Sequence, residues 1–156
     1  MKLGEPKTVD YVNISRYSGR WYEQASIPAG FEANCTDTQA HYSPIDSMTI
    51  EVENSCVLNG QGQRYAMVGK GLCEDNTHSK LKLIFNPIEK VVGQYWIVKL
   101  GEASNYGYSV VSSSDYVRLY ILSREAAIDQ ATYDSIIEWL KIQGGFRYEK
   151  LVRTKR

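Results

Sequence analysis

The side chains that could carry chemistry in this sequence are few and scattered. Cysteine occurs at Cys35, Cys56 and Cys73, and the histidines are His41 and His78. The cysteines are too few for a disulfide scaffold and lack metal-ligand spacing, so at most one disulfide can form within the chain. No paired carboxylates, phosphate-binding loop or Ser-His-acid pattern stands out. We therefore expect no catalytic residues, no metal site and no cofactor.

Length and charge are those of one soluble globular domain. The 156 residues suffice for one sizeable core, so we treat 1–156 as a single domain. Eighteen Lys and Arg balance eighteen Asp and Glu, which argues against a nucleic-acid partner. No apolar run approaches the roughly 18 residues that span a bilayer, and the first six residues lack the apolar centre of a signal peptide. The twelve tyrosines suit half-buried strands and cavity walls.

Periodicity predicts an all-β fold. From about Gln39 to Arg124, short β-type runs are separated by Gly, Pro, Asn, Asp and Ser, which is typical of a sandwich or barrel. Apolar and charged side chains alternate in the earlier runs, whereas the later runs are apolar on both faces, as expected beside an outer helix. The predicted strands include 21–26, 48–54, 64–72, 79–85, 93–100, 106–112 and 116–123. Eight such strands can close into an up-and-down antiparallel barrel over about 17–124.

The segment after the predicted barrel has helical periodicity. Apolar residues recur at i, i+3, i+4 and i+7 from Tyr133 to Leu140, which predicts a helix over about 129–143. Asp129 is the expected N-cap, and a Gly-Gly pair ends the helix. A short closing strand is predicted over about 146–152. We expect the helix to pack on the outside of the barrel.

Motifs on successive predicted strands carry a family resemblance. They are Gly19-Arg20-Trp21-Tyr22-Glu23, Ala40-His41-Tyr42-Ser43, Val52-Glu53-Asn54-Ser55-Cys56, Tyr95-Trp96-Ile97-Val98, Asn105-Tyr106-Gly107-Tyr108-Ser109 and Tyr120-Ile121-Leu122-Ser123-Arg124. Together they resemble the lipocalin family, in its bacterial lipocalin and apolipoprotein D-like branch. The resemblance implies a calyx that binds or transports a small hydrophobic or amphipathic ligand, with membrane maintenance, stress response or lipid carriage near an envelope.

The resemblance also implies a plug at one end of the barrel. Trp21 should close that end with Arg124 stacked on its indole ring, a structural pair rather than a ligand contact. If Arg124 points inward, Leu122, Tyr120 and Arg118 point inward as well, since alternate side chains of a strand take alternate faces. Leu119 and Ile121 then face the helix.

The expected ligand-binding side chains lie on the inner faces of the strands. They are Tyr42, Ile50, Val52, Asn54, Tyr65, Met67, Leu81, Leu83, Phe85, Tyr95, Ile97, Arg118 and Tyr120. This mainly apolar lining fits a fatty acid, lysophospholipid, sterol or similar amphiphile. Arg118 is a cation in an apolar wall. It must therefore pair with a carboxylate of the protein, extend to the mouth of the barrel, or bind the anionic head group of a ligand. A filled core without room for a ligand is the alternative.

Hairpin geometry pairs two of the cysteines. A turn near Asp46 brings Cys35 and Cys56 close to facing positions on the second and third strands, whereas the next turn, near Gly60, leaves Cys73 out of register with Cys56. We therefore expect a Cys35–Cys56 disulfide in an oxidising compartment and a free Cys73, unless a bulge shifts the register.

Two alternatives to a carrier stay open, although we expect no enzyme. One lipocalin branch isomerises prostaglandins with a cysteine inside the barrel, and by this analogy Cys56 is the candidate catalytic nucleophile. The other is a ligand-free protein that binds a partner through its loops. We expect a monomer or homodimer that is secreted, periplasmic or envelope-associated, with an intracellular location as the alternative. The basic residues 150–156 allow peripheral membrane contact, but a solvated terminus is the simpler account.

Overall fold

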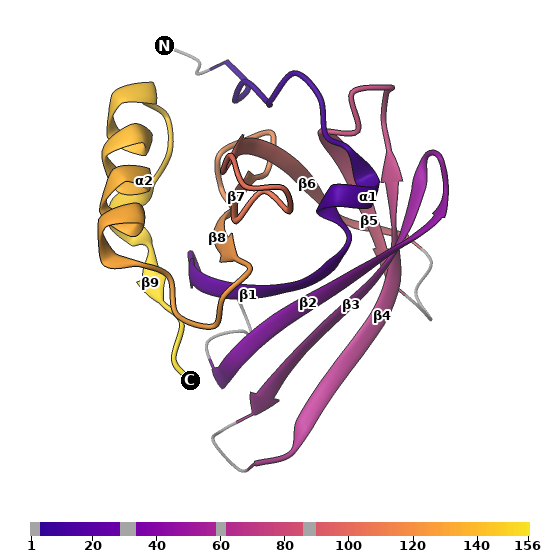
Figure 1. Cartoon of the computed structure of the whole chain (residues 1–156), viewed down its shortest axis with the longest axis horizontal. Helices are drawn as coiled ribbons and strands as arrows, with labels where there is room; N and C mark the ends of the chain where they lie inside the picture. Colours follow the sequence, from indigo (N-terminus) through magenta and orange to yellow (C-terminus); the bar gives the residue numbers. More distant parts are fainter. Residues whose placement is uncertain (1–3, 29–33, 59–61, 86–89) are drawn as a thin grey trace.

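Eight strands form the closed part of one antiparallel sheet, which curls into a barrel (Figure 1). The computed structural model describes residues 4–28, 34–58, 62–85 and 90–156. The strands are β1 (Gly19–Ser26), β2 (Cys35–Asp46), β3 (Thr49–Leu58), β4 (Arg64–Cys73), β5 (Lys80–Phe85), β6 (Lys90–Leu100), β7 (Tyr108–Ser112) and β8 (Leu119–Ser123). Each strand pairs with the next along the chain, and β1 pairs with both β8 and β2. The predicted eight-stranded antiparallel barrel is confirmed.

The β2–β3 hairpin shows why the sheet curls. Tyr42 faces Val52 across the hairpin and both are buried, whereas the neighbouring pair, His41 and Glu53, is exposed. Because one face of these two strands is apolar and the other polar, the sheet removes its apolar face from water by curling around it. His41 therefore lies on the surface, as its position in the strand predicts.

A helix packs against the outside of the barrel (Figure 1). Helix α2 (Gln130–Gln143) begins after Asp129, whose side chain accepts a hydrogen bond from the Thr132 amide, and it ends at Gly144, where φ is +74°. The buried face of α2 belongs to an outer apolar cluster between helix and barrel, comprising Ala25, Val98, Val110, Leu119, Ile121, Ile136, Leu140 and Phe146. The helix prediction is confirmed, and Leu119 and Ile121 face it as expected.

The predicted closing strand over 146–152 is wrong in extent. A 3-10 helix (Tyr148–Lys150) occupies its middle, and the strand β9 is Val152–Arg153 alone. The physical reason lies in β1, whose residues 19–22 pair with β2, so that pairing with β9 is confined to the last part of β1, at Ala25 and Ser26. Phe146 turns into the outer cluster instead of alternating between two faces of a sheet.

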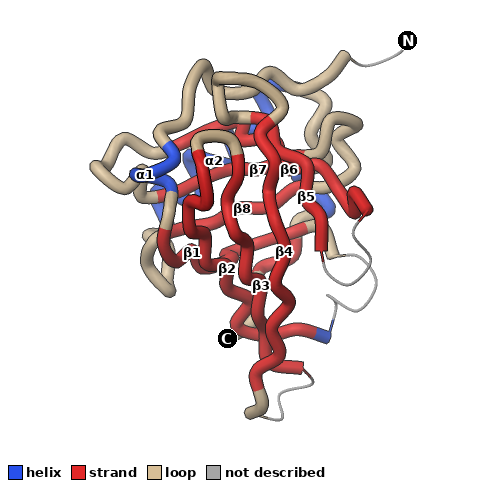
Figure 2. The backbone as a smooth tube through the Cα atoms, turned by 90° about the vertical axis from the view of Figure 1, so that its right-hand side faces the viewer, coloured by secondary structure: helices blue, strands red, loops and turns tan. Residues whose placement is uncertain are grey.

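The two ends of the barrel differ. At one end, here called the closed end, residues 9–17 cross the barrel: the Val9 amide donates to the carbonyl of Ile97 and the Val12 amide to that of Thr77. This segment includes a short helix, α1 (Ile14–Tyr17), that the sequence did not lead us to expect. The opposite, open end includes the β7–β8 connection, and there β2, β3 and β4 extend beyond the rest of the barrel (Figure 2).

Helices of the described ranges are all too short or too polar to cross a membrane.

Candidate functional site: the barrel interior

An aromatic plug fills the closed end. Trp21 is fully buried and donates its indole N–H to the carbonyl of Tyr17, 2.8 Å away. The guanidinium of Arg124 lies 3.8 Å from the centroid of the Trp21 ring, within the range of a cation–π contact. Arg124 also donates to the backbone carbonyls of Arg16, Ser18, Arg20 and Asn105. One side chain thus ties α1, β1 and the β6–β7 connection together under the barrel.

Three tyrosines stack above this plug. The ring of Tyr17 lies 5.0 Å from Trp21 and is stacked on Tyr42, with ring centroids 5.7 Å apart. Tyr95 meets the edges of both tyrosines, at 6.5 Å from Tyr17 and 5.8 Å from Tyr42. Offset and edge-to-face arrangements of this kind are the favourable ones for aromatic rings. The closed end is therefore a packed aromatic layer.

The hydroxyl groups of this layer form one hydrogen-bonded chain, which we call the hydroxyl chain. Tyr42 donates to Tyr95 over 2.9 Å, the hydroxyl oxygens of Tyr95 and Tyr17 are 2.6 Å apart, and those of Tyr17 and Ser109 are 2.8 Å apart. Burial raises the pKa of Tyr17 to about 12, and burial also raises the pKa of Tyr42 and Tyr95 well above the ordinary value. The layer is polar but disfavours negative charge.

Above the aromatic layer the inner wall is apolar, and its exposure increases toward the open end. Tyr42 is 3% exposed and Val52 1%, whereas Met67 is 46% and Tyr65 50% exposed. All four lie on the inner face, because Tyr42 faces Val52, Met67 faces Asn54 and Tyr65 faces Cys56. Solvent therefore reaches the inner face from one end only of the described wall.

Glycines on the inner face show where the wall is covered and where it is not. A Cβ at Gly69 would collide with the backbone carbonyl of Ile84 and with Phe85, and one at Gly71 would crowd the side chains of Ile50 and Leu81, so both glycines allow close packing. By contrast, a Cβ at Gly93 would meet no atom of the described residues within 4 Å. Gly93 faces Leu83 and shares the inward parity of Tyr95 and Ile97, so the wall borders open space at this point.

The structure brings most of the expected ligand-binding residues into one interior cluster. Its buried members are Val12, Tyr17, Trp21, Ala40, Tyr42, Ile50, Val52, Leu81, Phe85, Tyr95, Ile97, Tyr106, Val111 and Leu122. Leu83 and Tyr120 are partly buried against this cluster, and Asn54 is half-buried on the inner face. Tyr65 and Met67 share the inner face, as expected, but they lie on the half-exposed extension of β4 beyond the barrel and outside the enclosed cluster.

Arg118 sits at the open end, and not within the apolar wall. It precedes β8 in the β7–β8 turn, where its amide donates to the Ser113 hydroxyl, and it is half-buried. Within residues 4–28, 34–58, 62–85 and 90–156, its guanidinium has no carboxylate partner within 4 Å. This backbone position at the open end favours the second of the three predicted possibilities, in which the side chain of Arg118 extends to the mouth of the barrel.

Sequence reasoning missed two members of the hydroxyl chain. Tyr17 lies on a four-residue helix, too short to leave a periodic signal. Ser109 faces Leu122 across β7 and β8, so the inward parity of Leu122 contained the information needed to place it inside the barrel. A serine in a predicted strand gives no hydropathy signal of its own, so only its position on the inner or outer face of the strand shows that it lies inside the barrel.

The predicted Cys35–Cys56 disulfide is confirmed, and Cys73 is a free thiol. The register differs from the expected one, because β2 bulges between Thr36 and Gln39 and Cys35 faces Leu58. The bridge is therefore diagonal, with Cα atoms 5.5 Å apart. While this bridge is intact, Cys56 has no thiolate to offer as a nucleophile. Burial raises the pKa of the Cys73 thiol, which weakens it as a nucleophile at neutral pH.

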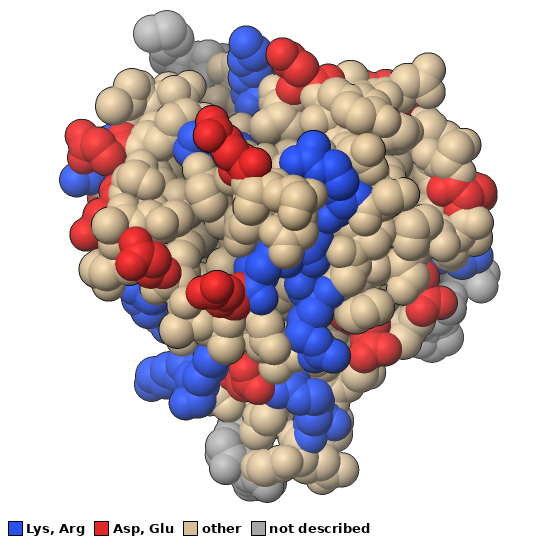
Figure 3. All heavy atoms as spheres, viewed as in Figure 1, with Lys and Arg blue, Asp and Glu red and all other residues tan. Residues whose placement is uncertain are grey.

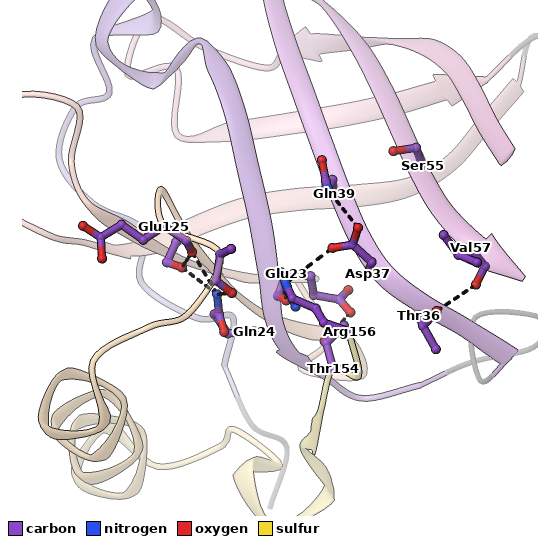
Figure 4. Close-up of polar contacts among 12 residues, drawn as sticks. Glu23, Gln24, Thr36, Asp37, Gln39, Ser55, Val57, Glu125, Thr154 and Arg156 are labelled. Carbon is purple, nitrogen blue, oxygen red and sulfur yellow. Dashed lines mark hydrogen bonds and ion pairs between the residues drawn. The ribbon is translucent and has the colours of Figure 1, made fainter. Parts of the chain in front are cut away.

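The basic segment 150–156 is docked on the barrel, contrary to the solvated terminus that we expected. Asp37 accepts hydrogen bonds from Gln39 and Arg64, its amide donates to the Lys155 carbonyl over 2.6 Å, and Arg156 lies 3.4 Å from its carboxylate. Figure 4 shows this hub beside Glu23, which accepts a hydrogen bond from Thr154. On the face in Figure 3, Lys and Arg form a band flanked by Asp and Glu, so no single charge sign dominates.

No cluster of three or more His, Cys, Asp or Glu side chains suited to a metal ion occurs in the part of the chain that the structure describes.

Comparisons with known proteins cover the whole barrel. A family model described as a lipocalin-like domain matches residues 12–156. Temperature-induced lipocalin-1 of Arabidopsis thaliana is 33% identical, over 96% of this chain and 82% of the relative. Outer membrane lipoprotein Blc of Vibrio cholerae is 29% identical, over 99% of this chain and 90% of the relative. The structure of insecticyanin from the tobacco hornworm Manduca sexta has a TM-score of 0.79 at 21% identity, over 97% of this chain and 85% of that one.

Proposed function

The chain belongs to the lipocalin family, and we propose that it binds and carries a small amphipathic molecule inside its barrel. Family and fold support the binding of a small hydrophobic ligand in general. The classes that we propose are fatty acids, lysophospholipids and sterols, because each joins an apolar body to a polar group. We propose no catalytic role, since the candidate nucleophile Cys56 is bonded to Cys35.

The observation that carries the proposal is the graded exposure of the inner wall. The wall is sealed at Trp21, is apolar at Val52 and Ile97, borders open space at Gly93 and opens at Met67. A chain of about 12 methylenes buried against such a wall gains roughly 10 kcal/mol. Ordering of the ligand and loss of its free translation offset several kcal/mol of that gain, so we expect micromolar or somewhat tighter binding.

Arg118 gives the proposed ligand its orientation. A half-buried guanidinium at the open end, without a carboxylate partner among the described residues, suits an anionic head group. The apolar body would then extend from Arg118 toward the aromatic layer. A carboxylate or phosphate at the mouth also stays in contact with water, which lowers the cost of desolvating it.

Native mass spectrometry of the purified protein, followed by lipid extraction, tests carriage directly. We expect co-purified amphiphiles, and we expect fatty acids and lysophospholipids to change tryptophan fluorescence, because Trp21 lies at the base of the barrel. Absence of any bound molecule, together with no fluorescence response to the whole panel, would overturn the proposal.

Paired ligands test the orientation. Arg118→Leu should weaken the binding of fatty acids about tenfold or more while leaving the matching alcohols within about twofold, since an ionic hydrogen bond is worth about 1.5 to 3 kcal/mol. Arg147→Leu, which removes an exposed cation near the end of α2, is the matched control. Equal loss for acids and alcohols would exclude a head-group role for Arg118.

We place this activity in the cell envelope or outside the cell. The relatives include an outer membrane lipoprotein, and the Cys35–Cys56 disulfide suits an oxidising compartment. Localisation of the tagged protein in its own organism, combined with the redox state of these cysteines, tests the placement.

A further inference from the structure

The hydroxyl chain contains one proton more than the hydrogen bonds that join its members. Tyr42, Tyr95, Tyr17 and Ser109 supply four hydroxyl protons, but three hydrogen bonds join them. All four residues are at most 8% exposed. Each of these hydrogen bonds uses one proton, so one of the four buried hydroxyl protons is not used within the chain of hydroxyl groups. Leaving a buried donor without a partner is unfavourable, because its hydration is lost without replacement.

A ligand can supply an acceptor for the extra proton at one end of the hydroxyl chain. Ser109 is fully buried between β6 and β8. Tyr42, in contrast, is covered by Tyr17 on its closed-end side, and the next inward residue along β2 toward the open end is the small Ala40. Of the two ends of the hydroxyl chain, the Tyr42 hydroxyl is therefore the one that a molecule entering from the open end can meet.

From this arrangement we infer that the Tyr42 hydroxyl is a deep subsite for a neutral oxygen atom, a hydroxyl or carbonyl, at the buried end of the ligand. When such an oxygen accepts from Tyr42, each hydroxyl can rotate so that Ser109 donates to Tyr17, Tyr17 to Tyr95 and Tyr95 to Tyr42. Every proton of the chain then has an acceptor. The inference rests on the proposed function and names the ligand class more narrowly: an amphiphile with a second, uncharged oxygen far from its anionic head.

The charge preference of the subsite follows from its surroundings. The aromatic layer excludes water, and burial raises the pKa of all three tyrosines, which shows that negative charge is unfavourable there. A carboxylate at this depth would lose its hydration without meeting a cation, since the guanidinium of Arg124 is engaged below the plug with four carbonyls. The carboxylate is thus directed to the mouth and the neutral oxygen to Tyr42.

Matched ligand pairs test the subsite. Saturated acids from lauric to stearic acid are titrated against the protein together with their ω-hydroxy counterparts. An apolar pocket without a partner rejects an added hydroxyl by about tenfold or more, whereas a hydrogen bond offsets that cost. We expect that at one chain length the ω-hydroxy acid binds as tightly as the methyl-terminated acid or up to about fivefold more tightly.

Substitution of Tyr42 assigns the effect to this hydroxyl. Tyr42→Phe should make the ω-hydroxy acid about tenfold weaker while changing the methyl-terminated acid by about twofold or less. Tyr108→Phe, which removes a hydroxyl outside the barrel, should leave the ratio of the two affinities unchanged. If Tyr42→Phe does not fold, the comparison of ligands on the unaltered protein still decides.

Two outcomes would overturn the subsite: a tenfold or greater penalty for the ω-hydroxyl at every chain length, or an affinity ratio that Tyr42→Phe leaves unchanged. Failure of both acids to bind is a separate result, which would remove the proposed function itself and the subsite with it.

Discussion

The guanidinium of Arg124 and the indole of Trp21 lie in contact, 3.8 Å from the guanidinium carbon to the ring centroid. The same guanidinium donates to four backbone carbonyls, so its removal leaves several acceptors without partners. We expect Arg124→Ala to lower the free energy of unfolding by about 3 kcal/mol, measured by urea denaturation. Arg124→Lys should restore less than half of this loss, because an ammonium cannot reach four acceptors in one plane.

Arg20→Ala is the control for that change. Arg20 is exposed, and its side chain contacts Gln39 on the surface, so we expect a loss of about 0.5 kcal/mol or less. Equal losses for Arg20→Ala and Arg124→Ala would show that the plug contributes nothing beyond an ordinary surface contact.

The hydroxyl chain predicts a loss of stability in alkaline solution. Burial raises the pKa of Tyr17 from 10.0 to about 12, so the folded state holds this proton more tightly than the unfolded chain does. The contribution is complete below pH 10 and is lost as the pH rises through about 12; for Tyr17 it amounts to about 3 kcal/mol. Urea denaturation at a series of pH values should show the fall beginning near pH 10.

Tyr17→Phe separates this effect from general alkaline damage. The variant has lost the ionising group, so its unfolding free energy should fall less steeply with pH than that of the unaltered protein. Parallel curves for the two proteins would contradict the assignment to Tyr17. The absorbance of tyrosinate, followed in the folded state, gives an independent reading of the same titration.

Much of the fold follows from the sequence, but depth and long-range contacts do not. Alternation in strands such as 48–54 identifies the inner face, and the resemblance to the lipocalin motifs identifies Trp21 and Arg124 as the plug. Alternation does not tell how far a residue lies from the end of a barrel, so it could not distinguish the half-exposed inner-face residues Met67 and Tyr65 from enclosed ones such as Val52. The side of the sheet on which a side chain lies is set by its own strand. Its distance from the end of the barrel depends instead on where the neighbouring strands end.

The contacts of residues 152–156 show the second limit. Thr154 binds Glu23 and Arg156 binds Asp37, residues more than a hundred positions away along the chain. The composition of a short basic segment does not indicate which distant carboxylates, here near the start of the chain, will accept its hydrogen bonds. The same holds for Tyr17, whose partner Ser109 becomes visible only when the closed barrel brings α1 against β7.

The disulfide gives a prediction about both bonding and stability. Cys35 and Cys56 are 21 positions apart, and closing a loop of this size stabilises the folded state by about 3 kcal/mol in the chain-entropy model. Replacing both cysteines with serine should therefore lower the free energy of unfolding by about that amount. Alkylation of the non-reduced protein followed by mass mapping should label Cys73 alone. Label on Cys35 or Cys56 would contradict the bridge.

Asp37 carries the last prediction, because it joins β2, β4 and the end of the described chain. Its carboxylate meets Arg64 and Arg156, all three side chains being partly exposed, and its φ is +50°. Asp37→Asn keeps a side chain suited to positive φ and removes the charge, so we expect a loss of about 1 kcal/mol that shrinks in high salt. Asp37→Ala should lose about 1 kcal/mol more, from backbone strain that salt does not relieve. A double-mutant cycle with Arg156→Gln should give a coupling of about 0.5 to 1 kcal/mol, and additive losses would mean that Arg156 does not bind Asp37 in solution.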